Sequence, residues 1–384
     1  MIITRVEAHS FRNITHDRFE PSSQLNFLYG CNAQGKTNWL EVIHLLAAGS
    51  SFRTTRLSEA LTHGCQESVL RTSVRHQGLE KELAVQLTPR SKTLYVNGKR
   101  ESTSRYVGHL TVFVCSLEHM NVIRGEPEYR RHFLDQGALS LDPKYAKTVE
   151  TYNRVLKQKN RLLRQIAEQP NPQPLIDQIH IWNQQLIEYG TAIHRVRSHF
   201  IEKLQEELNG NLFEKEEIKV RYTSSLESHG DLDDYAGLLA ERLKVRLNAE
   251  MAVGYSLVGP HRDDLEVRFD GHDVRRFGSA GQQRSALLIL DLARISVYNK
   301  TVGEYPVFMI DDIDAELDRR RIEVLLDYLQ NKTQALITTS KRNIATAYSG
   351  RAAVFCVEEG RVRIEHMLRR VNQGGAELIA SERE

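Results

Sequence analysis

The chain has 384 residues, of which 40% are hydrophobic and 27% are charged, and its formal net charge at pH 7 is +2. This length and composition are typical of a globular protein with about two domains. No apolar run approaches the ~18 residues of a membrane span, the N-terminus lacks the apolar core of a signal peptide, and the four cysteines form no C-x-x-C pair. The sequence therefore argues against a membrane protein, a disulfide scaffold and a zinc site, and it predicts a cytoplasmic protein with no membrane partner.

The N-terminal third is rich in β-branched and aromatic residues. Short strands are expected at 2–6, 69–74, 83–87, 93–96 and 110–114. Asn97-Gly98 is the dipeptide that tight two-residue hairpins prefer, so the strand at 93–96 is expected to turn back there.

Residues 30–37 read Gly-Cys-Asn-Ala-Gln-Gly-Lys-Thr, a complete G-x-x-x-x-G-K-T phosphate-binding loop. An apolar run at 25–29 precedes it and a helical pattern at 38–43 follows, in the strand–loop–helix order that this motif requires. Backbone N–H groups of such a loop surround the phosphates, Lys36 contacts the β- and γ-phosphates, and the Thr37 hydroxyl binds Mg²⁺. We therefore predict that the chain binds a nucleoside triphosphate. The expected contact residues are Gly30, Asn32, Ala33, Gln34, Gly35, Lys36, Thr37 and Asn38.

Two long helical patterns follow in the middle of the chain. Apolar residues recur in steps of three and four at 145–166 and again at 175–204, and a proline-rich break separates the two runs. We expect an antiparallel helical hairpin, a short arm at about 143–209. Lys159 interrupts the apolar face of the first helix.

The first helix of the arm is basic. Between Lys144 and Ile166 there are seven basic residues and one acidic residue. Five of the basic residues have the spacing of a single helical stripe: Lys147, Arg154, Lys157, Arg161 and Arg164. Such a stripe can neutralise DNA phosphates without reading bases, although a solvated helix face would look the same. Rival candidates for DNA contact are Arg53, the Lys99-Arg100 hairpin, and Arg262 next to Gly259-Pro260, where a plain turn is the alternative.

An apolar run at 306–310 ends in Asp311 and Asp312. A buried strand that presents Asp at its C-terminal end supports Mg²⁺ in phosphate-loop enzymes, so we assign Asp311 to the metal and Asp312 to general-base activation of water. Upstream, residues 279–283 read Ser-Ala-Gly-Gln-Gln and begin a strongly helical run. An ordinary N-cap is the simpler reading of that segment, but beside the other two motifs we assign Ser279, Gly281 and Gln282 to anion binding.

The order of these motifs resembles that of ATP-binding-cassette (ABC) ATPases of the SMC type. Further segments narrow the resemblance to the RecF family: Phe11-Arg12-Asn13, residues 51–54, residues 130–135, and Gly-Pro-His-Arg-Asp-Asp-Leu at 259–265. It covers essentially the whole chain and implies an α/β, SMC-head-like ABC ATPase with a mixed sheet and a helical second lobe that bears the arm. The implied domains are an ATPase lobe at 1–117 and 303–384 and a helical lobe at 118–302.

The resemblance also implies roles for individual residues. ATP and Mg²⁺ would be the cofactors, with Lys36, Asp312 and Glu118 as catalytic residues and Glu118 in the place of the Q-loop residue. Arg12 and Asn13 would lie at the base-proximal edge of the site. The signature residues Ser279 and Gly281 would reach the γ-phosphate held by a second copy, and 315–318 would form the D-loop. Thr339 stands where many relatives have a His, and because a hydroxyl cannot become cationic we expect slow hydrolysis.

Members of the resembled family are weak, DNA-stimulated ATPases that form homodimers on ATP and bind double-stranded DNA near single-strand gaps. They act with RecR and RecO to load RecA in DNA repair, replication, recombination and the SOS response. A non-hydrolysing structural scaffold remains an alternative. A transporter subunit is disfavoured because Gly281 lies too far from Lys36 for a compact cassette, and a small-molecule kinase would not need the segment at 279–283.

Overall fold

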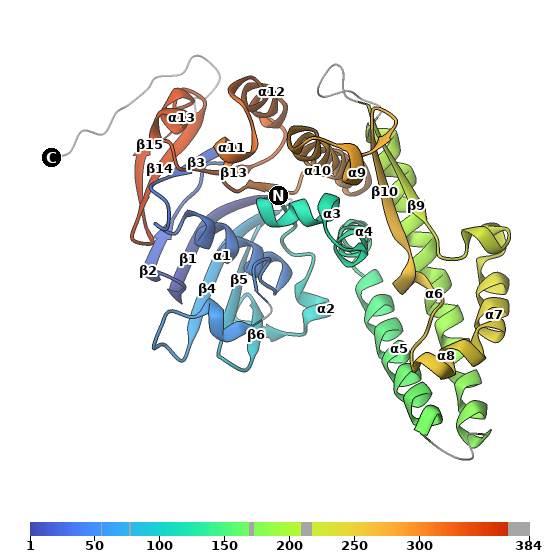
Figure 1. Cartoon of the computed structure of the whole chain (residues 1–384). Helices are drawn as coiled ribbons and strands as arrows, with labels where there is room; N and C mark the ends of the chain where they lie inside the picture. Colours follow the sequence, from blue (N-terminus) through green and yellow to red (C-terminus); the bar gives the residue numbers. More distant parts are fainter. Residues whose placement is uncertain (55, 77, 169–172, 209–216, 368–384) are drawn as a thin grey trace. The chain divides into compact units, whose positions relative to one another are not determined.

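In the computed structural model, residues 1–54, 56–76, 78–168, 173–208 and 217–367 are described (Figure 1). They fall into two compact units. Unit 1 comprises Met1–Met120 and the chain from Leu287 onward, and unit 2 comprises Asn121–Ala286. Helix α10 (Ala280–Val302) contains the boundary between them. Within the described ranges, no helix has both the length and the apolar character needed to cross a membrane.

Unit 1 contains a six-stranded mixed sheet. In spatial order its strands are β15 (Arg361–His366), β14 (Ala352–Glu358), β3 (Leu25–Tyr29), β13 (Ala335–Thr339), β12 (Val307–Ile310) and β8 (Val112–Cys115). All neighbours pair in parallel except β15, which is antiparallel to β14. Because every residue of β3, β12 and β13 is buried, these strands read as short apolar runs rather than alternating patterns.

A second, antiparallel sheet completes unit 1. Its strands, in spatial order, are β2 (Ile14–Phe19), β1 (Ile2–Phe11), β4 (Ser68–His76), β5 (Leu79–Leu87), β6 (Lys92–Val96) and β7 (Lys99–Glu101). The predicted strands are confirmed, and φ is positive at both Asn97 (49°) and Gly98 (75°), as the expected hairpin turn requires. Helix α1 (Lys36–Ala48) lies against β1, β4 and β5 (Figure 1). Its Trp39 and Leu40 are buried in the core shared with these strands.

Short helices connect these strands. They are α2 (Thr103–Tyr106), α11 (Ile313–Glu316), α12 (Arg319–Leu329) and α13 (Arg342–Ala347).

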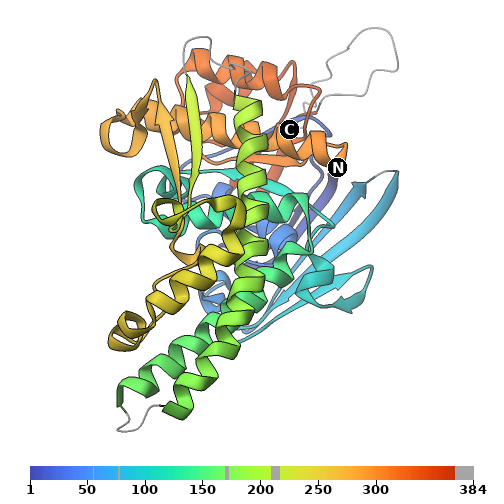
Figure 2. The ribbon, with the colours of Figure 1, turned by 90° about the vertical axis from the view of Figure 1, so that its right-hand side faces the viewer.

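Unit 2 is mainly helical. Its helices are α3 (Asn121–Arg124), α4 (Pro127–Leu141), α5 (Tyr145–Glu168), α6 (Gln173–Leu208), α7 (Tyr235–Val245), α8 (Leu247–Val253) and α9 (Val274–Phe277). Figure 2 shows α5 and α6 side by side, so the predicted helical hairpin is confirmed. Tyr152 and Val155 on α5 pack against Leu186 and Ile193 on α6. The break at 169–172 lies outside the described residues. The sequence did not reveal a small sheet of β9 (Ile218–Thr223), β10 (Asp264–Phe269) and β11 (His272–Asp273).

Lys159 interrupts the apolar face of α5 because it forms a buried ion pair. Its Nζ lies 2.6 Å from Glu250 Oε2, and neither side chain is exposed to solvent. Burial lowers the pKa of Lys159, and Glu250 opposes that effect. Lys159 therefore contributes no charge to the surface of the arm, which reduces the basic count that the sequence suggests.

Candidate nucleotide-binding site

The phosphate-binding loop joins β3 to α1, and its two motif glycines are required sterically. Gly35 has φ of 108°, and a Cβ at this position would lie 2.7 Å from Asn13 Oδ1. A Cβ on Gly30 would lie 2.2 Å from the Val357 carbonyl oxygen. Lys36, which is 8% exposed, donates from Nζ to the carbonyls of Gly30 (2.7 Å) and Cys31 (3.0 Å). The loop is thus already shaped, and its lysine is held at the position where phosphate oxygens would bind.

The metal candidates meet at one edge of the mixed sheet, because β3, β12 and β13 are parallel and end there. Thr37 Oγ1, in the first turn of α1, donates to Asp311 with contacts of 2.9 and 3.0 Å to its two oxygens. Thr338 Oγ1 on β13 donates to Asp311 Oδ1 at 2.7 Å. Hydroxyl and carboxylate oxygens are the ligands that Mg²⁺ prefers, so Thr37 and Asp311 fit the predicted ion.

Asp312 has an unusual backbone and an unusual environment. Its φ and ψ are 57° and 54°, in the left-handed region that few non-glycine residues occupy. Burial and the negative charges of Asp314 and Asp311 raise its pKa, with Lys36 and Lys341 opposing them. Its Oδ1 is buried and, among the described residues, has no hydrogen-bond partner. A carboxylate in this state is suited to accept a proton from a nearby water.

These residues share one pocket of about 330 Å³ in unit 1. It is lined by Asn32, Ala33, Gly35, Lys36, Thr37, Asn38, Arg53, Asp311 and Asp312. Of the predicted loop contacts, Gly30 and Gln34 are not in its wall. Gln34 instead connects the loop to the end of β14, because its Oε1 accepts a hydrogen bond from the Glu359 N–H at 2.7 Å.

The turn between β1 and β2 supports the same loop. Asn13 Nδ2 donates to the Gln34 carbonyl at 3.1 Å, and Asn38 Nδ2 donates to Asn13 Oδ1 at 2.8 Å. Arg12 forms a bidentate ion pair with the buried Glu41 of α1, from Nε at 3.0 Å and from Nη2 at 2.8 Å. Neither Arg12 nor Asn13 is in the pocket wall. Asn13 holds the loop directly, and Arg12 holds α1 through Glu41.

Arg53, named from sequence as a DNA candidate, lies at the pocket. Its Nη1 donates to Asn38 Oδ1 at 2.9 Å and lies 3.4 Å from Glu41 Oε2. This guanidinium is therefore oriented by α1 and lines the space that a nucleotide would occupy.

The predicted signature residues belong to unit 2, at the start of α10. Ser279 Oγ accepts the Gln282 N–H at 3.3 Å, and the Ser279 N–H donates to Gln282 Oε1 at 2.8 Å. This reciprocal arrangement is a helix cap, which is the simpler reading from sequence. A Cβ on Gly281 would meet nothing closer than Ser279 Oγ at 4.0 Å. The backbone at Gly281 is therefore open to an approaching ligand.

The sequence did not identify Asp314, which organises the end of β13. Thr339 Oγ1 donates to Asp314 Oδ1 at 2.6 Å, Ser340 Oγ donates to Oδ2 at 3.1 Å, and Lys341 Nζ lies 3.5 Å from Oδ2. Burial raises the pKa of Asp314, but the hydrogen bonds from Thr339 and Ser340 outweigh it and lower the pKa below the ordinary value. The Thr339 hydroxyl thus uses its single donor in a hydrogen bond to Asp314. The acidic run that begins at Asp311 was the sequence signal that could have identified Asp314.

Two predicted elements are described only in part. Glu118 lies in a 3₁₀ turn (Leu117–Met120) that follows β8, and its side chain is outside the described part of the structure. The same holds for the side chains of Ala315 and Glu316 in the predicted D-loop.

The DNA candidates of unit 2 fall into two groups. Lys147, Arg154, Lys157, Arg161 and Arg164 are all exposed on α5. Arg262 instead lies in a 3₁₀ turn (Pro260–Arg262), where its Nη2 donates to the Ser256 carbonyl at 3.1 Å. Next to it, His261 Nδ1 is 2.7 Å from Tyr152 Oη, and burial lowers the pKa of His261 to about 4. This segment therefore joins α5 to the rest of unit 2.

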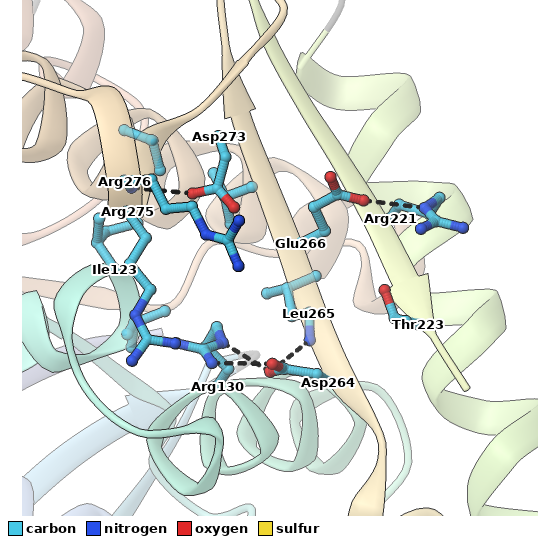
Figure 3. A pocket seen from close by; sticks show the side chains of 13 residues that line it. Ile123, Arg130, Arg221, Thr223, Asp264, Leu265, Glu266, Asp273, Arg275 and Arg276 are labelled. Atoms are coloured by element: carbon cyan, nitrogen blue, oxygen red, sulfur yellow. Dashed lines mark hydrogen bonds and ion pairs between the residues drawn. The ribbon is translucent and has the colours of Figure 1, made fainter. Parts of the chain in front are cut away.

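A second pocket, of about 320 Å³, lies in unit 2 beside β10 and α9 (Figure 3). Its arginines are mostly paired. Arg130 contacts Asp264 through two bonds of 2.6 and 2.9 Å, and Arg221 Nε contacts Glu266 Oε2 at 3.0 Å. Arg130 and Asp264, both in segments that suggested the RecF family, thus tie α4 to β10.

Comparisons with known proteins agree with this arrangement. The family model for the RecF/RecN/SMC N terminal domain matches residues 2–363. The DNA replication and repair protein RecF of Pelotomaculum thermopropionicum is 36% identical over 372 residues, which cover 94% of this chain and 100% of that protein. The RecF protein of Geotalea daltonii is 32% identical over 376 residues, with the same coverage of both chains.

Solved structures give the same result. The recombination mediator protein RecF-ATP of the RecFOR pathway matches with a TM-score of 0.85 and 30% identity, over 94% of this chain and 97% of that chain. The Smc head domain from Pyrococcus furiosus, bound to the C-terminal domain of ScpA, matches with a TM-score of 0.54 over 94% of this chain and 95% of its own. At 15% identity this second match shows the fold alone. The predicted fold class, an SMC-head-like ABC ATPase, is confirmed.

Proposed function

The chain belongs to the RecF family, within the wider RecF/RecN/SMC group, and we propose that it is a recombination mediator in which ATP controls self-association on DNA. One observation carries the proposal: Lys36, Thr37, Asp311 and Asp312 line a single pocket. These are the four groups that hold phosphates, bind the metal and activate water in phosphate-loop ATPases.

In this proposal the residues of unit 1 perform the chemistry. Lys36 exchanges its two loop carbonyls for β- and γ-phosphate oxygens, and the first N–H groups of α1 hold the phosphates. Thr37 and Asp311 would hold Mg²⁺, and its charge would offset that of the phosphates. Asp312 takes the proton of the attacking water. ATP turnover below about 10 per second is expected, because Thr339 cannot become cationic and its hydroxyl already donates a hydrogen bond to Asp314.

We assign the signature residues to the nucleotide of a second copy. Ser279 and Gly281 begin a 23-residue helix whose first N–H groups favour an anion. ATP bound by one copy would then be covered by unit 2 of the other, and two copies would enclose two nucleotides. Relatives of this chain are described as RecF-ATP in the RecFOR pathway. By analogy we propose that it binds duplex DNA near single-strand gaps and acts with RecR and RecO to load RecA.

Light scattering of an Asp312→Asn variant tests the proposal, because this change removes the base and keeps ATP bound. The mass should double when ATP is added, and it should stay that of one copy in the Ser279→Arg and Lys36→Ala variants. A mass that ignores ATP would contradict the proposal. Phosphate release, measured with and without duplex DNA, separates an ATPase from a non-hydrolysing scaffold. Only an ATPase should release phosphate, and the Asp312→Asn substitution should abolish that release.

A further inference from the structure

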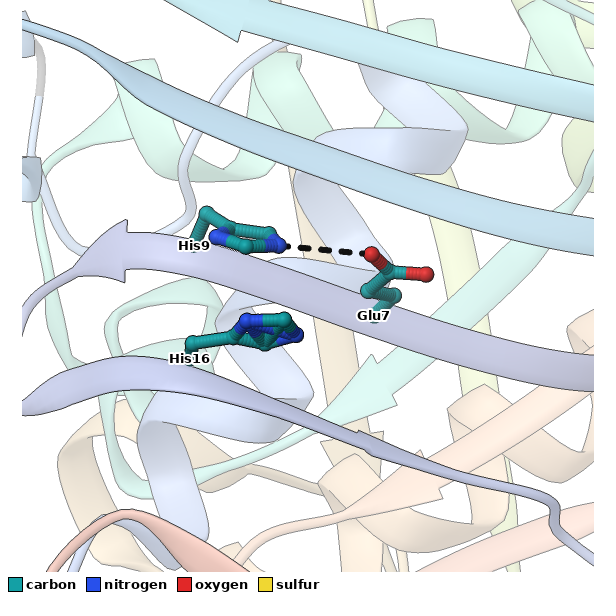
Figure 4. Close-up of side chains that lie close together, drawn as sticks. All are labelled: Glu7, His9 and His16. Carbon is teal, nitrogen blue, oxygen red and sulfur yellow. Dashed lines mark ion pairs between the residues drawn. The ribbon is translucent and has the colours of Figure 1, made fainter.

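Three side chains that commonly bind metals lie together on the β1–β2 hairpin of unit 1 (Figure 4). Glu7 and His9 are two residues apart on β1 and so point to the same face, opposite to the core residues Val6 and Ala8. His16 on β2 is the direct cross-strand partner of His9. One potential ligand atom from each residue lies within 4.8 Å of the other two.

The spacing of these groups suits a single metal ion. His9 Nε2 is 3.3 Å from Glu7 Oε1, close to the ~3.3 Å that separates two ligands around a tetrahedral ion with bonds of about 2.0 Å. The rings of His9 and His16 have centroids 3.6 Å apart. His9 is partly exposed and His16 exposed, whereas Glu7 is 8% exposed. Solvent can therefore reach the ion and supply a fourth ligand.

Neighbouring arginines hold the carboxylate in a state that can bind a cation. Arg5 Nη2 donates to Glu7 Oε2 at 2.6 Å, and this contact leaves Oε1 facing His9. Arg71 Nη1 is more distant, 3.8 Å from Oε1. Burial raises the pKa of Glu7, but the hydrogen bond and charge of Arg5 and the charge of Arg71 outweigh it and lower the pKa. Arg5 thus orients the Glu7 carboxylate toward His9, in the way that outer groups orient metal ligands.

We propose that Glu7, His9 and His16 form a binding site for a divalent transition-metal ion. Two imidazole nitrogens and one carboxylate select Zn²⁺, Ni²⁺ or Cu²⁺ over Mg²⁺, which prefers oxygen ligands. The site is thus chemically distinct from the Thr37–Asp311 position in the nucleotide pocket.

The position of the site on the hairpin gives the ion a structural consequence. After the His9–His16 pair, the hairpin has only the Phe11–Ile14 pair before its turn at Arg12 and Asn13. Asn13 is the residue that contacts the phosphate-binding loop. A bound ion would cross-link the two strands beside this turn and hold Asn13 against the loop.

Zn²⁺ binding to the whole chain, freed of metal and without nucleotide or Mg²⁺, tests the proposal. Titration against a chromophoric chelator should give one Zn²⁺ per chain, and Co²⁺ should give the visible absorption bands of a tetrahedral N/O site. His16→Ala and Glu7→Gln should each weaken Zn²⁺ binding at least tenfold and remove the Co²⁺ bands. His63→Ala, at another exposed histidine of unit 1, is the matched control and should change neither.

The exposed thiol of Cys31 is a competing ligand, and a Cys31→Ser variant separates the two sites. The proposal is overturned if Cys31→Ser removes the bound Zn²⁺ while His16→Ala keeps it, or if the unaltered chain takes up no stoichiometric Zn²⁺. Because His16 is exposed, its loss should leave the melting temperature of the metal-free chain unchanged. Thermal melting without metal confirms that the His16→Ala chain is folded. If that variant does not fold, Glu7→Gln and His9→Ala provide the same comparison.

Discussion

Asp314 is the residue through which the end of β13 is linked to the carboxylates of the proposed active site. Asp314 accepts hydrogen bonds from the hydroxyls of Thr339 and Ser340 and pairs with Lys341. Its negative charge also raises the pKa of Asp312. A hydroxyl at position 339 therefore does not act alone, because its orientation depends on Asp314. Asp314 is a positioning residue, and its charge influences the base.

This electrostatic link predicts a shift in the pH profile of ATP hydrolysis. As the proposed general base, Asp312 would have to be ionised, so hydrolysis should fall as the pH falls through its raised pKa. Asp314→Asn removes one of the negative charges that raise this pKa. The acid limb of kcat against pH should therefore move to lower pH in Asp314→Asn, whatever happens to the maximum rate.

Asp327→Asn is the matched control. Asp327 is an exposed carboxylate on α12 that pairs with Arg351 at 2.6 Å, and it is not among the groups that shift the pKa of Asp312. Its variant should keep the wild-type acid limb. A purely structural role for Asp314 would lower kcat at every pH by the same factor, and that result would refute the electrostatic link.

At the scale of elements, helix α5 has two faces with different tasks. Tyr152 and Val155 pack into unit 2, and the buried pair of Lys159 with Glu250 joins the same helix to α8. Removing one member of such a pair leaves an uncompensated charge, so the pair fixes the position of α5 even where it adds little net stability. The solvent-facing side of α5 carries the five exposed basic residues of the stripe.

We predict that this exposed face contacts DNA phosphates. Arg154→Glu combined with Lys157→Glu should weaken duplex binding and reduce the slope of log K against log salt by about 2, since each phosphate contact contributes roughly 0.9. The control reverses two exposed basic residues elsewhere in unit 2, Lys244→Glu with Arg246→Glu. Binding should be measured over a range of salt concentrations. An unchanged slope in the α5 variant, or equal loss in both, would assign the DNA to another surface.

The sequence predicts these elements where their signals are local. The phosphate-binding loop, the strand before Asp311 and the hairpin of α5 and α6 each lie within one continuous segment, so spacing alone reveals them. The sheet of β9, β10 and β11 was missed because β9 pairs with β10 across a segment that contains α7 and α8, and β11 has only two residues. From sequence, Lys159 was recognised only as an interruption of the apolar face of α5. Its ion pair was not predicted, because its partner Glu250 lies far along the chain.

In the candidate site, too, the sequence reveals residues within local motifs but not those that depend on distant partners. Lys36, Thr37, Asp311 and Asp312 are recognisable from motifs, and the parallel sheet brings them together. Asp314 was missed because its role depends on the hydroxyls of a neighbouring strand. Arg53 was named from sequence as a rival candidate for DNA contact, because sequence gives its charge but not its contact with Asn38. Residues whose function depends on a partner from another strand cannot be identified from spacing alone.

At the scale of the whole molecule, the two halves of the proposed active site belong to different units of the chain. Unit 1 provides the phosphate-binding loop and the carboxylates, and unit 2 provides Ser279 and Gly281. If each signature serves the nucleotide of a second copy, hydrolysis per chain must rise with protein concentration until dimers are complete. If it serves its own copy, hydrolysis per chain is independent of concentration.

Mixing two inactive variants decides between these cases. Lys36→Ala removes a phosphate contact from unit 1 and Ser279→Arg blocks the signature in unit 2, so each variant alone should be inactive. In a mixed dimer, the intact loop of the Ser279→Arg copy faces the intact signature of the Lys36→Ala copy. Neither variant is expected to pair with itself, so every dimer in an equal mixture is mixed and has one complete site of two. The mixture should therefore recover up to about half of wild-type activity. Inactivity of mixed dimers, once light scattering has shown that they form, would place both halves of the site in one copy.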